Sequence, residues 1–92
     1  MRPVTIASVA ATFKKRLKSK TQADRDLVVA AIEQMEENLN HASLRVRRIV
    51  SKPGVWEARA SESLRLSFEF VGAEQIRLRV NCSHDQVYGP RG

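Results

Sequence analysis

The second half of this sequence alternates apolar and polar residues over three short stretches, and arginine recurs at the polar positions. The stretch 64–70 has the sequence LRLSFEF, and the stretch 76–80 has the sequence IRLRV. Successive side chains of a β-strand point to opposite faces, so Leu64 and Phe68 share one face while Arg65 lies on the other. The alternation therefore predicts a sheet with one packed face and one cationic face.

The last stretch is expected to continue this alternation to its end. The residues predicted to point inward are Ile76, Leu78, Val80 and Cys82. The residues predicted to point outward are Arg77, Arg79 and Asn81. A third strand is predicted over 56–60, with Trp56 and Ala58 in the core and Glu57 and Arg59 on the cationic face.

The first half of the chain has helical periodicity. Val4 to Ile6 is short and β-branched and predicts a first strand, and Ser8 is a plausible N-cap for a helix with an apolar stripe at Phe13 and Leu17. Thr21 is the expected N-cap of a second helix, which ends near 38–40.

The stretch 44–50 is predicted to be a strand, although its alternation breaks after Arg47. A bulge near Arg47 and Arg48 or a register shift would each explain the break. The element order is then β-α-α-β-β-β. It indicates an α+β fold in which a helical hairpin packs on one face of a small, mainly antiparallel sheet of four strands. Residues 1–92 are expected to form a single domain, with a flexible tail at 89–92.

Charge and composition narrow the possible partners and the compartment. The net charge of +6 favours a polyanionic partner. No apolar run is long enough to span a bilayer, so no membrane association is expected. The N-terminus lacks a signal-type stretch, and Cys82 has no partner for an internal disulfide. The interpretation is a cytoplasmic protein.

Several pieces of the chain, in this order, resemble the RelE/ParE superfamily of bacterial toxin–antitoxin toxins. They are the short first strand, the helical hairpin with a basic first helix, the meander with Trp56, Glu57 and Arg59 followed by Leu64–Phe68, and the last strand running into His84. The resemblance implies a RelE-like fold and, because of His84, the branch of RelE, YoeB and HigB, which cleave mRNA on the ribosome. Two alternatives remain open: a ParE-like poison of DNA gyrase, and a non-catalytic relative that binds nucleic acid.

Metal-free RNA cleavage needs a base, an acid and cations around the phosphate. Arg65 matches the family's phosphate-binding arginine by position, and Arg59 is the second candidate. His84 is the candidate acid or base near neutral pH. Glu57 is a candidate base, with an ion pair to Arg59 as the alternative, and Tyr88 is a candidate for base stacking or proton transfer.

The remaining basic residues of the second half are assigned to RNA or ribosome binding. They are Arg45, Arg47, Arg48, Lys52, Arg77 and Arg79. An ion pair between Arg65 and Glu69 is an alternative role for Arg65. Cys82, His84 and His41 are too few and too scattered for a metal site, so no metal or other cofactor is expected. The implied partners are a cognate antitoxin with an acidic or amphipathic segment, the ribosome and mRNA.

Overall fold

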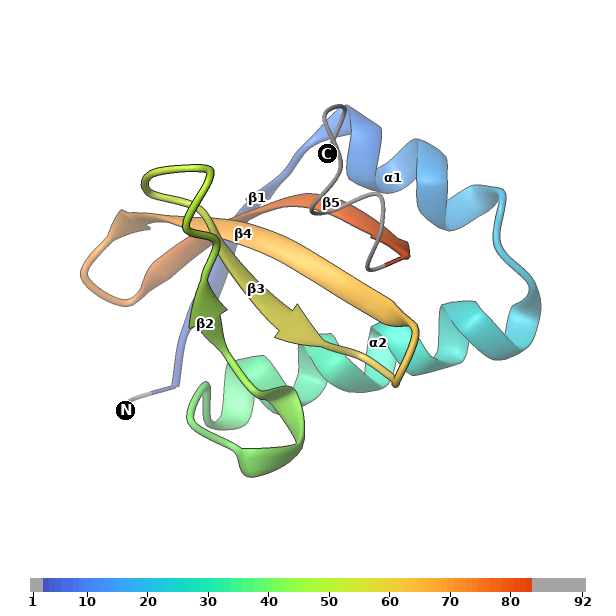
Figure 1. The fold of residues 1–92 in the computed structure, drawn as a ribbon, viewed down its shortest axis with the longest axis horizontal. Coiled ribbons are helices and arrows are strands. Elements are labelled where there is room, and N and C mark those ends of the chain that lie inside the picture. Colours follow the sequence, from blue (N-terminus) through green and yellow to red (C-terminus); the bar gives the residue numbers. More distant parts are fainter. Residues whose placement is uncertain (1–2, 84–92) are drawn as a thin grey trace.

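The alternating stretches form a sheet, and two helices pack on one of its faces (Figure 1). The computed structural model describes residues 3–83. The helical elements are α1 (Ala11–Lys18), α2 (Gln22–Glu37) and a 3-10 helix, η1 (Ala42–Leu44). The strands are β1 (Thr5–Val9), β2 (Arg47–Arg48), β3 (Trp56–Arg59), β4 (Leu64–Gly72) and β5 (Gln75–Ser83).

The five strands form one mixed sheet in the order β1-β5-β4-β3-β2. β1 pairs with β5 in parallel, and the other three pairings are antiparallel. The predicted α+β class and the mainly antiparallel sheet are therefore confirmed. All five stretches that the sequence predicts to be extended contribute a strand to this sheet, so the expected count of four is one too low.

The start of α1 differs from the prediction. Ser8 lies within β1, opposite Arg77, and α1 begins after Ala10, which has no side-chain cap. Pairing with β5 keeps the chain extended as far as Val9, and the Ala10 amide still donates to the Leu78 carbonyl at 2.8 Å. Thr21 is the N-cap of α2 as predicted, since its hydroxyl accepts from the Asp24 amide.

The core lies between the two helices and one face of the sheet. Phe13 of α1 and Val28 and Met35 of α2 are at most 2% exposed, and Leu17 of the predicted stripe of α1 is half-buried against them. The sheet residues that meet them are Ala58, Leu66, Phe68, Ile76 and Leu78. Trp56 is half-buried and packs against this cluster, which agrees with its predicted core position.

A bulge in β5 overturns the predicted orientation of its last residues. Ser67 lies opposite Val80 while the next residue, Phe68, lies opposite Leu78, so Arg79 is the extra residue. Beyond it the parity reverses, and Val80 leaves the helix-packed face. Asn81, predicted to point outward, is completely buried, and its Nδ2 donates to the Phe13 carbonyl of α1 at 2.7 Å.

Residues 44–50 form less strand than predicted. η1 ends at Arg45, which has a left-handed backbone with φ of 45°, and only Arg47 and Arg48 pair with β3. A left-handed residue cannot continue a ladder, so the strand begins after it. Ile49 and Val55 then form a second small apolar cluster with Val80, on the face that the helices leave open.

We expect the buried Asn81 to be important for stability. Replacing it with alanine removes the β5–α1 hydrogen bond and leaves a void, which should lower the free energy of unfolding by about 1–3 kcal/mol. Urea unfolding followed by circular dichroism measures the loss. The control is Asn40→Ala at an exposed position, which should change stability by less than about 0.5 kcal/mol. Equal effects of the two substitutions would contradict the role assigned to Asn81.

Candidate functional site

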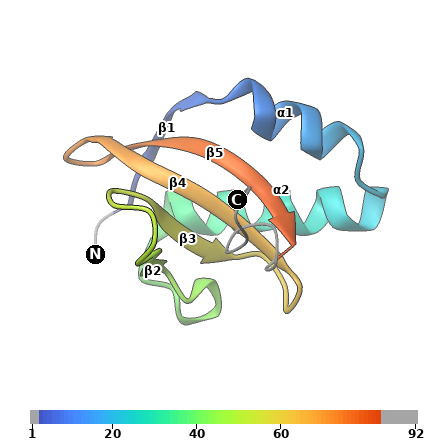
Figure 2. The ribbon, with the colours of Figure 1, turned by 45° about the horizontal axis from the view of Figure 1, so that its top comes forward.

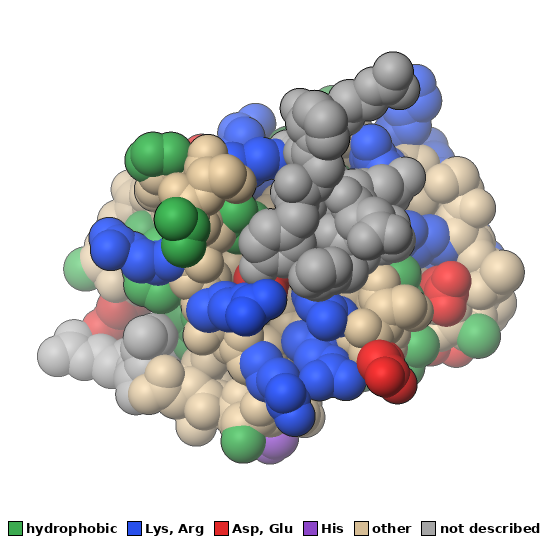
Figure 3. All heavy atoms as spheres, viewed as in Figure 1, with side chains coloured by type: hydrophobic (Ala, Val, Ile, Leu, Met, Phe, Trp, Pro, Cys, Tyr) green, Lys and Arg blue, Asp and Glu red, His purple; other side chains and the backbone are tan. Residues whose placement is uncertain are grey.

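The face of the sheet opposite the helices carries most of the residues singled out for function. In Figure 2, α2 runs behind the sheet and leaves the front of β2, β3 and β4 uncovered by helix. Lys and Arg side chains gather on this face, over β2, β3 and the β3–β4 hairpin (Figure 3). The predicted cationic face is therefore present.

Two arginines lie directly opposite each other on this face. Arg59 of β3 pairs with Arg65 of β4 in the antiparallel register, and both are half-buried. Like charges at directly opposed positions destabilise a sheet unless an anion lies between them. The strands thus bring together the two residues predicted to bind phosphate.

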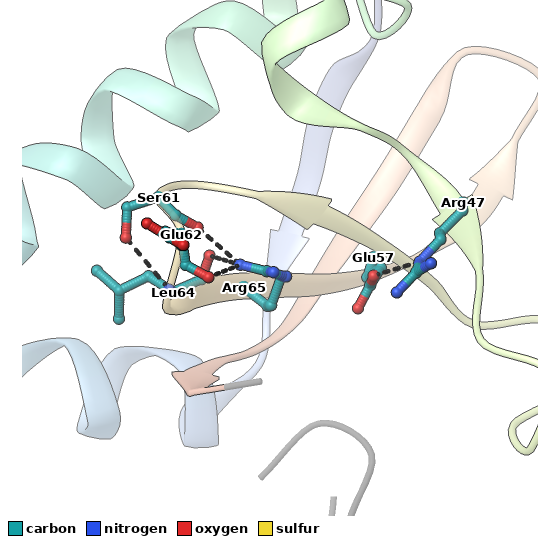
Figure 4. A network of polar contacts seen from close by, with 6 residues as sticks. All are labelled: Arg47, Glu57, Ser61, Glu62, Leu64 and Arg65. Carbon is teal, nitrogen blue, oxygen red and sulfur yellow. Dashed lines mark hydrogen bonds and ion pairs between the residues drawn. The ribbon is translucent and has the colours of Figure 1, made fainter. Parts of the chain in front are cut away.

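The Arg65 guanidinium is fixed by the hairpin that joins β3 to β4 (Figure 4). Its Nη1 donates to the carbonyls of Ser61, Glu62 and Leu64 at 2.7, 2.9 and 3.2 Å. Arg59 makes no hydrogen bond or ion pair with any of the residues that the structure describes. Arg65 is therefore held in place by the hairpin, whereas the guanidinium of Arg59 has no such restraint among the described residues.

Glu57 lies inside this basic face. Only 3% of the residue is exposed, and its Oε1 accepts from Arg47 Nε of β2 at 2.7 Å (Figure 4). Its Oε2 is buried without a hydrogen-bond partner. The alternative pairing of Glu57 with Arg59 does not occur, because the cross-strand register puts Arg47 directly opposite Glu57.

Glu69, a further acidic residue of the face, also does not pair with Arg65, the partner considered for it from the sequence. Glu69 lies opposite Arg77 and pairs with it at 3.7 Å and with Arg79 at 3.8 Å, and it makes no pair with Arg65. The three side chains are 34–42% exposed, so these pairs contribute little to stability. Arg77 and Arg79, both predicted to bind RNA, are thus partly neutralised by Glu69.

The other predicted binding residues lie around the β2–β3 connection. Arg45 is exposed after η1, and Lys52 is half-buried in the turn before β3. The exposed Arg48 places its guanidinium over the Trp56 ring, 5.5 Å from the ring centroid. Arg48 also borders a shallow pocket of about 310 Å³, whose other lining residues are Ile49, Val50, Pro53, Gly54 and Val55.

His84 and Tyr88 lie outside the described residues, as does the predicted tail at 89–92. Their roles stay predictions from sequence. Within residues 3–83, no three His, Cys, Asp or Glu side chains come together as metal ligands. Neither helix in that range is long and apolar enough to cross a membrane.

Sequence reasoning missed two features of this face. From the sequence, Arg47 was assigned only to RNA or ribosome binding. In the structure it forms an ion pair with Glu57 across β2 and β3. Sequence reasoning also missed that Ser67, directly opposite Glu57, is buried at 6% exposure. Glu57 and Ser67 both stand at polar positions of the alternating pattern, which indicates that they lie on the same face of the sheet. The register that places them opposite each other cannot be deduced from one sequence.

Comparisons with known proteins place the fold. No protein-family model matches the sequence, and no curated protein matches it. A chain of the E. coli DinJ–YafQ toxin–antitoxin complex is 12% identical, with a TM-score of 0.73 over 94% of this chain and 100% of that chain. This protein has the RelE-like toxin fold.

Two further solved structures share the RelE-like fold. One is a chain of the RelB–RelE antitoxin–toxin complex from Methanococcus jannaschii, 23% identical, with a TM-score of 0.64 over 89% of this chain and 95% of that one. The other is a YoeB/ParE toxin from Agrobacterium tumefaciens, which is 12% identical. Its TM-score is 0.67, and the match covers 91% of this chain and 99% of that chain. The resemblance found in the sequence is thereby confirmed at the level of the fold.

The opposed arginines of this RelE-like fold should differ in what they do for stability. Arg65→Ala removes the charged donor that three hairpin carbonyls share, and should lower the free energy of unfolding by about 1.5–3 kcal/mol. Arg59→Ala removes no such bond and removes the like-charge repulsion with Arg65. The free energy of unfolding should therefore change by no more than about 0.5 kcal/mol. Urea unfolding curves measure both. A larger loss for Arg59→Ala than for Arg65→Ala would contradict this assignment.

Proposed function

We propose that the protein is the toxin of a toxin–antitoxin pair and acts as a ribosome-dependent mRNA endonuclease. The observation that carries the proposal is the arrangement of Arg59, Arg65 and Glu57 on the open face. Two arginines oppose each other beside a buried carboxylate that has one free oxygen. Phosphate binding and proton abstraction need these groups, and packing alone gives no reason to keep them together.

The chemistry follows from the groups present. The ribose 2′-hydroxyl attacks the adjacent phosphorus, the bond from phosphorus to the 5′-oxygen breaks, and the 2′-proton passes to Glu57 Oε2. Arg65, held by the hairpin carbonyls, and Arg59 stabilise the additional negative charge on the phosphate oxygens. The leaving 5′-oxygen receives a proton from an acid, for which His84 is the candidate from sequence and Tyr88 is a second candidate for proton transfer. Arg45 and Lys52 would add cations for the RNA backbone near the β2–β3 connection, and Arg48 would add one at the edge of the sheet beside Trp56.

The antitoxin partner is proposed from the fold comparisons and the charge. Two of the similar structures are complexes of a toxin with an antitoxin. This chain carries a net charge of +6 and an open face with opposed arginines, so the matching partner segment is acidic or amphipathic. Its binding would place carboxylates where the phosphate of the substrate otherwise lies. The proposed compartment is the cytoplasm, where ribosomes and mRNA are found.

The first test is mRNA cleavage mapped by primer extension in a purified translation system, with and without ribosomes. We expect cuts that require ribosomes and that fall by about 10²-fold in Arg59→Ala and by about 10²–10⁴-fold in Glu57→Gln and His84→Ala. Arg59→Ala is a cleaner probe than Arg65→Ala, because it leaves the hairpin hydrogen bonds intact.

The control variant is Lys14→Ala on α1, an exposed cation on the side of the sheet away from the site, which should cleave as the wild type does. A folded wild type that produces no cuts would overturn the nuclease proposal. In that case a gyrase supercoiling assay would test the ParE-like alternative, and the loss of both activities would leave a nucleic-acid binder.

Phosphate contacts also predict a salt dependence. Ribosome affinity should fall steeply between about 50 and 200 mM salt, because binding releases counterions from the RNA. Removing one contributing cation, as in Arg45→Ala or Arg48→Ala, should make the plot of log affinity against log salt shallower by about one unit. Filter binding over a salt series measures the slopes. Equal slopes for Arg48→Ala and wild type would show that Arg48 makes no contact with the RNA phosphates.

A further inference from the structure

Arg47 and Glu57 form an ion pair with a marked asymmetry in burial. The Arg47 side chain is 61% exposed on the edge strand β2, whereas the Glu57 side chain on β3 is 3% exposed. The two residues lie directly opposite each other, and the Nε–Oε1 distance is 2.7 Å. An exposed arginine therefore reaches inward to hold a buried carboxylate.

The charged and polar groups that face Glu57 come from three strands. They are Arg47 of β2, Arg59 of β3, and Arg65 and Ser67 of β4. Of these, only Arg47 donates a hydrogen bond to the carboxylate, since Arg65 donates to hairpin carbonyls and the Ser67 hydroxyl lies 3.4 Å from the Val80 carbonyl. Arg47 is thus the cation that compensates the buried charge directly.

The two carboxylate oxygens of Glu57 are consequently unequal. Oε1 is occupied by Arg47, and Oε2 is buried with no hydrogen-bond partner. A buried acceptor without a donor is unfavourable, so the unpaired Oε2 calls for an explanation, and a donor supplied by a bound ligand is one that the opposed arginines nearby favour. The donor that suits a carboxylate oxygen beside opposed arginines is a hydroxyl next to a phosphate, as in a ribonucleotide.

We propose that Arg47 is a positioning residue, which holds Oε1 so that Glu57 presents Oε2 to the attacking 2′-hydroxyl. This inference rests on the proposed nuclease function and deepens it. In the step concerned, the 2′-oxygen forms its bond to phosphorus as its proton moves to Oε2, and the 5′-oxygen leaves with a proton from the acid. Arg47 touches neither the substrate nor the reacting atoms.

This role differs from the backbone contact that the sequence predicts for Arg47. A residue that only binds RNA changes KM, because its contact is the same in the ground state and the transition state. A residue that acts through Glu57 changes kcat, and its effect disappears once Glu57 no longer acts as a base.

The experiment is a double-mutant cycle on ribosome-dependent cleavage by the full chain, with Arg47→Ala, Glu57→Gln and the double variant. We expect Arg47→Ala to lower kcat by about 10-fold or more with KM changed by less than about 3-fold. In the Glu57→Gln background, Arg47→Ala should change kcat by less than about 2-fold. Arg47→Lys keeps the charge and should recover part of kcat.

Arg48→Ala is the matched comparison, since it removes the adjacent arginine of the same strand, which stacks on Trp56 and makes no contact with Glu57. It should raise KM and leave kcat nearly constant. Urea unfolding of every variant establishes that the activity measured belongs to folded protein, and Arg47→Lys retains the test if Arg47→Ala does not fold.

Two results would overturn the inference: a rise in KM alone for Arg47→Ala, or kcat losses that multiply in the double variant. A wild type that binds ribosomes but cuts nothing would instead overturn the proposed function itself. The two failures are therefore distinguishable in one data set.

Discussion

The sheet depends on one extra residue in β5. The bulge at Arg79 lets Leu78 pack with Phe68 on the helix side and then places Val80 opposite Ser67 on the open side. Past the bulge, Asn81 enters the core and ties β5 to α1 through the Phe13 carbonyl. A β5 without this residue would put Val80 into the core and Asn81 onto the open face. The core contact of α1 and the small apolar cluster of Ile49, Val55 and Val80 would then both be lost.

The open face combines groups that are individually unfavourable. Arg59 and Arg65 repel each other across two strands, and Glu57 keeps a buried oxygen without a donor. Loss of Arg47 alone would leave the buried carboxylate of Glu57 without the cation that compensates it, so Arg47 and Glu57 are energetically linked. The arrangement is consistent with a surface completed by a ligand that brings both a phosphate and a hydroxyl. In its absence the β3–β4 hairpin carbonyls hold Arg65 in place.

The sequence predicted what depends on strand parity and failed where parity is interrupted. Arg65 and Leu66 lie on their predicted faces because β4 is regular through that stretch. Val80 and Asn81 do not, because the alternation of 76–82 continues without a break across the bulge at Arg79. The two ion pairs considered as alternatives, Glu57–Arg59 and Arg65–Glu69, do not form, for a related reason. Glu57 meets Arg47 across β2, and the short, irregular 44–50 segment concealed that register.

A buried carboxylate also limits which variants of this face remain stable. Glu57 is flanked by Arg47, Arg59 and Arg65, so the net positive charge of the face is lower than a count of its arginines suggests. An apolar residue at this position would remove the unsatisfied oxygen and raise the charge that the arginines share. Such a face would bind polyanions more strongly, yet it would have lost the acceptor for a hydroxyl proton. In the proposed nuclease, affinity for RNA and the capacity to cleave it would therefore make opposite demands at position 57. The pairing with Arg47 satisfies both, because it compensates the carboxylate while leaving Oε2 free.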